Sequence, residues 1–105
     1  MNLKIIICDD EEQQSNFIKT LLNEYMKQHT HSIETIIFPS AESFLFYYTE
    51  DKSADIILLD IEMSGMNGIE LARQIRESNH EIQIIFITGY MEYIAAGYDV
   101  EALHY

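Results

Sequence analysis

The stretch Ile56-Ile57-Leu58-Leu59-Asp60 is a short apolar run that ends in an oxygen-bearing side chain, and the chain has two more runs of this kind. Ile5-Ile6-Ile7-Cys8 runs into Asp9-Asp10, and Ile84-Ile85-Phe86-Ile87 runs into Thr88. Runs of this length and composition are typical of parallel strands that are buried on both faces. In an open α/β sheet, the carboxyl ends of such strands meet at one edge, where ligands bind. We therefore expect the oxygen-bearing side chains to gather at that edge.

Three of the groups expected at this edge are the carboxylates of Asp9, Asp10 and Asp60. Negative charges that converge repel one another, so either a hard cation lies among them or their protonation shifts. The sequence therefore predicts a divalent metal site built around one special aspartate.

Composition limits the class of protein. The chain has 105 residues and is 48% hydrophobic, which suits one compact domain over residues 1–105. Eighteen acidic against six basic residues give a net charge of −12, which argues against binding of this segment to nucleic acid or to an anionic membrane. The single cysteine cannot form an internal disulfide, and no signal peptide or long apolar span is recognisable. We expect a cytoplasmic protein.

Strand-like runs alternate with amphipathic stretches along the whole chain. An α/β protein is expected from such alternation, with a doubly wound parallel sheet, because parallel strands need crossover helices. We predict strands at residues 3–8, 33–38, 55–59 and 82–87, and the beginning of a fifth at 102–105. Helices are predicted at about 12–28, from the N-cap Ser40 through Tyr48, at 69–78 and at 91–96.

The motifs resemble those of one known family, the receiver domains of two-component response regulators. The matching pieces are residues 5–11, residues 56–63, Gly68, residues 84–89 and residues 102–105. The resemblance spans the whole chain. Residues 86–93 and 97–105 look most like receivers attached to DNA-binding domains of the LytTR type. The family has a flavodoxin-like five-stranded parallel sheet in the order 2-1-3-4-5.

The resemblance implies a chemical role for each acid at the sheet edge. Asp60 would be the phosphoacceptor that takes a phosphoryl group from a histidine kinase. Asp10 and Asp60 would bind Mg²⁺ or Mn²⁺ directly, with the backbone carbonyl of Glu62 as a third ligand and Asp9 acting mainly through water. A site with few protein ligands suits an ion that keeps several waters.

The resemblance also implies a switch and a longer protein. Thr88 would sense the phosphoryl group with its hydroxyl, and Tyr105 would swing inward in response. Receivers carry an essential lysine shortly after that aromatic residue, but this chain ends before it. We therefore expect a truncated segment with an incomplete fifth strand and without the fifth helix and the output domain. We also expect such a segment to self-associate as a homodimer or larger species.

Two other function classes stay open at this point. A receiver-like interaction module without phosphorylation is one. The other is a haloacid-dehalogenase-type phosphohydrolase, suggested by Asp60-Ile61-Glu62 and Thr88, although the acidic pair of this chain precedes the nucleophile. The receiver function itself is not enzymatic beyond self-phosphorylation and slow loss of the phosphoryl group.

The sequence also gives expectations for Cys8, for a cluster of aromatic residues and for two histidines. Cys8 is expected to be a buried hydrophobe, because nearby carboxylates raise a thiol pKa. The aromatic residues between Phe44 and Tyr48 cover too much of a helix to be all core, so some should be exposed. His29 and His31 are read as part of a polar loop in preference to a metal pair.

Overall fold

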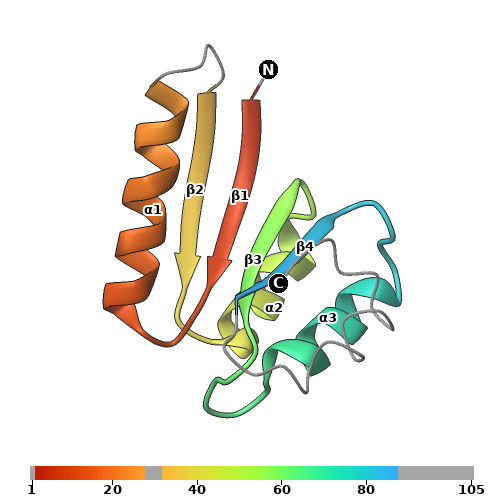
Figure 1. Ribbon diagram of the computed structural model, residues 1–105. Coiled ribbons are helices and arrows are strands. Elements are labelled where there is room, and N and C mark those ends of the chain that lie inside the picture. The colour runs from red at the N-terminus through yellow and green to blue at the C-terminus, as the bar shows by residue number, and fades with distance from the viewer. Residues whose placement is uncertain (1, 28–31, 88–105) are drawn as a thin grey trace.

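The computed structural model describes residues 2–27 and 32–87 of the chain, which Figure 1 draws in colour. Strands and helices alternate along this part, as the sequence predicts. The elements are β1 (Asn2–Cys8), α1 (Glu12–Lys27), β2 (Ser32–Phe38), α2 (Ala41–Glu50), β3 (Ile56–Asp60), α3 (Gly68–Arg76) and β4 (Gln83–Ile87).

The four described strands form one parallel sheet in the order β2-β1-β3-β4. This flavodoxin-like arrangement confirms the predicted doubly wound sheet and the first four places of the predicted strand order. Register aligns the strand ends, since Cys8 pairs with Leu59 and Leu59 pairs with Phe86. The helix predicted at 91–96 and the strand predicted at 102–105 lie outside the described residues.

Element boundaries differ from the predicted ones by one or two residues. β3 spans Ile56–Asp60 instead of 55–59, and the carboxylate of Asp55, just before the strand, accepts the Lys4 amide proton at 2.8 Å. β4 begins at Gln83, since the side chain of Asn79 accepts the amide proton of Ile82. α3 ends at Arg76 instead of residue 78.

The main core lies between one face of the sheet and the two helices α2 and α3. Burial of each large apolar side chain stabilises the fold by roughly 1.5–3 kcal/mol. Alternate strand residues supply this face, because successive side chains of a strand point to opposite sides. The strand side chains are Ile6, Cys8, Ile57, Leu59, Ile84 and Phe86, and the helices add Phe44, Tyr48, Leu71, Ala72 and Ile75 among others.

Helix α1 packs against β1 and β2 and buries less of its apolar surface than its sequence suggests. Six apolar residues fall at helical spacing, but Phe17, Leu21 and Tyr25 are 50–63% exposed. The main contacts of the helix are with these two strands, and a large part of its apolar side stays exposed. On α2, Phe46 is also exposed while Phe44 is buried, which confirms that the aromatic cluster is only partly core.

Candidate functional site

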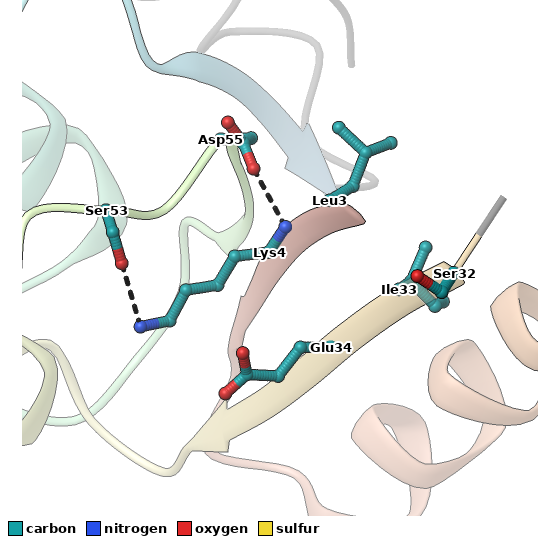
Figure 2. A pocket seen from close by; sticks show the side chains of 7 residues that line it. All are labelled: Leu3, Lys4, Ser32, Ile33, Glu34, Ser53 and Asp55. Carbon is teal, nitrogen blue, oxygen red and sulfur yellow. Dashed lines mark hydrogen bonds between the residues drawn. The ribbon is translucent and has the colours of Figure 1, made fainter. Parts of the chain in front are cut away.

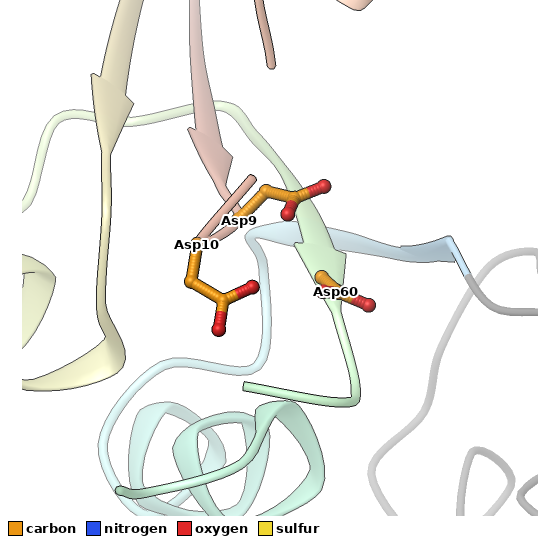
Figure 3. Close-up of side chains that lie close together, drawn as sticks. All are labelled: Asp9, Asp10 and Asp60. Carbon is orange, nitrogen blue, oxygen red and sulfur yellow. The ribbon is translucent and has the colours of Figure 1, made fainter. Parts of the chain in front are cut away.

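The three predicted carboxylates do converge at the carboxyl ends of the strands. Asp9 and Asp10 directly follow β1, and Asp60 is the last residue of β3. β1 and β3 are neighbours in register, which brings the acids together. One carboxylate oxygen from each residue lies within 4.8 Å of the others. Figure 3 shows the three side chains grouped at the ends of these strands.

Burial and mutual repulsion hold Asp60 partly protonated. The pKa of its carboxyl is raised to about 7, first by burial and then by the negative charge of Asp9, with Asp10 adding to the effect. The backbone amide of Glu62 bonds this carboxylate and pulls the pKa the other way. Burial also raises the pKa of Asp9. A carboxyl that resists ionisation here would ionise readily beside a cation.

Asp9 offers a free oxygen inside the cluster. The residue is buried, and its Oδ1 accepts the amide proton of Glu11 at 2.9 Å. Its Oδ2 is buried without a hydrogen-bond partner. A buried carboxylate oxygen without a partner is costly, and a bound cation or its water would satisfy it. The residues present therefore fit a hard divalent ion.

Asp10 and Glu62 occupy the open side of the site. Asp10 is exposed, and its Oδ2 accepts the amide proton of Ser64 at 3.2 Å. Glu62 lies two residues beyond Asp60 with an exposed side chain. Ligation through its carbonyl stays a prediction. Thr88 and Tyr105, the predicted switch residues, lie outside the described residues, as do His29 and His31.

The loop of residues 61–67 is fixed where α3 begins. Asn67 is the N-cap of α3, and its side chain accepts the amide proton of Glu70 at 3.0 Å. The amide of Gly68 donates to the carbonyl of Ile61 at 3.0 Å. A Cβ on Gly68 would collide with the backbone carbonyl of Asp60. Only glycine therefore lets α3 start this close to the end of β3.

Cys8 is an inert part of the core, as the sequence indicated. The residue is fully buried, and its pKa is raised to about 12, mainly by burial and then by the charge of Asp9. Its Sγ donates to the carbonyl of Ser40 at 3.4 Å. A thiol with so high a pKa has almost no thiolate at neutral pH and is a poor nucleophile.

A separate hollow of about 340 Å³ lies at the opposite edge of the sheet, where the strands begin (Figure 2). Its one described cation, Lys4, is already paired with Asp51 at 2.6 Å and hydrogen-bonded to Ser53. The hollow lies at the other ends of the strands from the acidic cluster, and none of the three clustered acids lines it. Its lining residues are Leu3, Lys4, Ser32, Ile33, Glu34, Ser53 and Asp55.

Residues 5–105 match the family of the response regulator receiver domain. The chain belongs to this family. The match spans nearly the whole chain, and the acidic cluster at the strand ends fits the phosphoacceptor site of a receiver. This receiver domain is therefore part of two-component signalling, and the resemblance drawn from its motifs is confirmed.

Relatives of this receiver agree with the family and with the LytTR resemblance. Among them is the sensory transduction protein LytT of Bacillus subtilis, 30% identical over 103 residues. The alignment covers 98% of this chain but only 41% of LytT.

Solved receivers share the fold. The response regulator TrrA of Thermotoga maritima is 28% identical with a TM-score of 0.79, and the match covers 98% of this chain and 84% of TrrA. The response regulatory domain of mrkE from Klebsiella pneumoniae is 30% identical with a TM-score of 0.83, covering 98% of this chain and 80% of that domain. Among the described residues of this receiver, no helix is both long and apolar enough to cross a bilayer.

Sequence reasoning missed two contacts beside the cluster. The loop after Asp60 is held by two carboxylates. That of Asp10 accepts the amide proton of Ser64, and that of Glu42 accepts the amide proton of Met66. Glu42 lies 24 residues before Met66 in the sequence, so no local pattern could have connected them. The stretch Ser64-Gly65-Met66-Asn67-Gly68 is the sequence signal for a tight turn at this place.

Proposed function

We propose that residues 1–105 form one receiver domain in which Asp60 accepts a phosphoryl group from a phosphohistidine of a histidine kinase. An oxygen of the Asp60 carboxylate attacks phosphorus, the P–N bond breaks, and its electron pair leaves on the imidazole nitrogen. The product is an acyl phosphate on Asp60. The observation that carries the proposal is the position of this carboxylate, at a strand end beside two further acids.

Mg²⁺, or Mn²⁺ in its place, is the cofactor that this acid set suits. Asp10 and Asp60 would hold the ion directly, the carbonyl of Glu62 would be a third ligand, and Asp9 would act mainly through water. The ion supplies positive charge that neutralises the oxygens of the incoming phosphoryl group. Support comes from TrrA, which is described in complex with Mg²⁺-BeF, and from the partnerless Oδ2 of Asp9.

The signal would leave the site through Thr88 and Tyr105. The Thr88 hydroxyl would donate to a phosphoryl oxygen, and Tyr105 would turn inward when Thr88 moves. Two packings that differ by a few kcal/mol are enough for such a switch. Thr88→Ala should therefore keep phosphorylation at Asp60 while abolishing the change in Tyr105 ring resonances on addition of a phosphodonor.

The whole protein would be a cytoplasmic transcriptional regulator. A histidine kinase is the proposed upstream partner, and a DNA-binding domain of the LytTR type is the proposed output. The chain spans less than half of LytT, so there is room for such a domain in a protein of that length. With its net charge of −12, this segment alone should not shift duplex DNA in a gel at physiological salt.

A receiver-fold interaction module without phosphorylation is the second candidate function. The exposed stripe of Phe17, Leu21 and Tyr25 on α1 is the observation that favours it. Treatment with a small phosphodonor and Mg²⁺, followed by intact-mass measurement, separates the classes. A lasting adduct indicates the phosphoacceptor, rapid turnover of donor indicates a phosphohydrolase, and no reaction indicates the module. We expect the adduct, and slow self-dephosphorylation as its only hydrolytic activity.

A further inference from the structure

The side chain of Glu42 reaches from α2 to the loop that follows Asp60. Its Oε2 accepts the amide proton of Met66 at 3.0 Å. The pKa of Glu42 is lowered, first by this bond and then by a bond from its own backbone amide. The carboxylate is therefore ionised and anchored to the first turn of its own helix, where a negative charge is favoured.

The turn at Gly65 is shaped to admit this carboxylate. Gly65 has a φ of +76°, a backbone conformation that residues with a side chain rarely adopt. A Cβ at this position would lie 2.5 Å from Oε2 of Glu42. Gly65 thus serves both the turn and the close approach of the acid. The Glu42 carboxylate thus lies against the loop at two neighbouring residues, Gly65 and Met66.

The contact lies at the far end of a loop that touches the acidic cluster twice. Within residues 61–67, the amide of Glu62 bonds the carboxylate of Asp60, and the amide of Ser64 bonds that of Asp10. Asn67 then caps α3. Without Glu42, the segment between Ser64 and Asn67 would have one fewer anchor among the described contacts. This segment would then sample more conformations. Binding of an ion at the cluster would have to restrict them again, and this entropy cost would lower the affinity for the ion.

We propose that Glu42 is a positioning residue for the metal site, acting through the loop it holds and not through its charge. The inference deepens the proposed function and rests on it. Glu42 bonds Met66, and the loop in turn presents the backbone of Glu62 and Ser64 to Asp60 and Asp10.

Three variants separate the hydrogen bond from the charge. Glu42→Ala removes both, while Glu42→Gln removes the charge but keeps an oxygen that can accept the Met66 amide proton. Glu50→Ala removes the same charge from the exposed last turn of the same helix and is the matched control. Each protein is titrated with Mg²⁺ by NMR, and hydrogen exchange of the Met66 amide is measured without metal.

We expect Glu42→Ala to bind Mg²⁺ about fivefold more weakly and to exchange the Met66 amide faster. Glu42→Gln should stay within about twofold of the wild type, as should Glu50→Ala. Equal loss of affinity in the Ala and Gln variants would overturn the inference in favour of a simple charge effect. Unchanged affinity in Glu42→Ala would also overturn it.

Failure of the proposed function gives a different result. If the wild-type chain binds no Mg²⁺, the metal site is wrong, whatever Glu42 does. Met66 exchange still decides the contact in that case, since unchanged exchange in Glu42→Ala would show that Glu42 does not hold the loop.

Discussion

The backbone amide of Ser64 donates a hydrogen bond of 3.2 Å to Oδ2 of Asp10, and so joins the loop after β3 to the loop after β1. Asp10 is exposed, and without such a bond its carboxylate would sample several rotamers. The bond therefore holds the Asp10 carboxylate in one orientation beside the acidic cluster. A carboxylate that is already oriented loses less conformational entropy when it binds a cation.

The first prediction concerns the metal. Added Mg²⁺ should raise the melting temperature of the chain, because a ligand that binds only the folded state stabilises it. Asp10→Asn should lose most of this gain, since an amide oxygen carries no full charge to offset that of the ion. Glu50→Gln, an exposed acid on α2, is the control and should keep the gain. An unchanged melting temperature at millimolar Mg²⁺ would count against the site.

A second prediction follows from the raised pKa of Asp60, which is about 7 in the folded protein against an ordinary value of 3.8. The folded state prefers the neutral acid, so this contribution to stability is full below about pH 4 and is lost as pH rises through about 7. Solvent screening at this half-buried group makes the effect smaller than the full shift implies. Melting of the metal-free chain from about pH 5 to about pH 8 should therefore show falling stability.

Asp60→Asn is the control for this pH dependence, because it removes the titrating group and leaves the histidines in place. The fall should be shallower in this variant. Equal slopes in the two proteins would show that Asp60 ionises normally.

A third prediction concerns Gly68, which allows α3 to start against the backbone of Asp60. Gly68 is the first residue of α3, so Gly68→Ala should gain less than the roughly 1 kcal/mol of helix propensity found in a helix interior. Collision of the new Cβ with the Asp60 carbonyl should outweigh this and cost roughly 2–4 kcal/mol in the free energy of unfolding. Chemical denaturation measures it, and Arg73→Ala on the exposed side of α3 should change stability by less than about 0.5 kcal/mol. A loss no larger in Gly68→Ala than in Arg73→Ala would contradict the close contact.

The alternation of strands and helices and the acidic cluster could be predicted from the sequence because their signals are local, whereas the strand order followed from the resemblance to the receiver family. Apolar runs such as 56–59 mark buried parallel strands, and parallel strands place the acids that follow them at one edge. Asp9, Asp10 and Asp60 were named on that ground, and the structure brings them together.

Other features depend on contacts between segments that are distant in the sequence, so they could not be predicted from it. The bond from Met66 to Glu42 spans 24 residues, and that from Ser64 to Asp10 spans 54. The extent to which α1 is buried also could not be predicted from the sequence. Spacing shows which side of a helix is apolar, but how much of that side is covered depends on which strands it contacts.

A fourth prediction is that the chain self-associates through the exposed stripe of Phe17, Leu21 and Tyr25 on α1. Exposed apolar patches of this kind favour association. Sedimentation at increasing concentration should show species larger than the monomer, and Leu21→Glu should reduce them. Asn23→Glu adds the same charge at an exposed position of the same helix and should have little effect. A monomer at all concentrations would contradict the prediction.

The central claim is that Asp60 is the phosphoacceptor of a Mg²⁺-dependent site. The most direct test is intact-mass measurement after incubation with a small phosphodonor and Mg²⁺, on the wild type and on Asp60→Asn. Asparagine keeps the shape of the side chain but lacks the nucleophilic carboxylate. We expect one added phosphoryl group in the wild type, none in Asp60→Asn, and none in the wild type when Mg²⁺ is removed by chelation. Labelling of Asp60→Asn to the same extent as the wild type, or no labelling of the wild type, would contradict it.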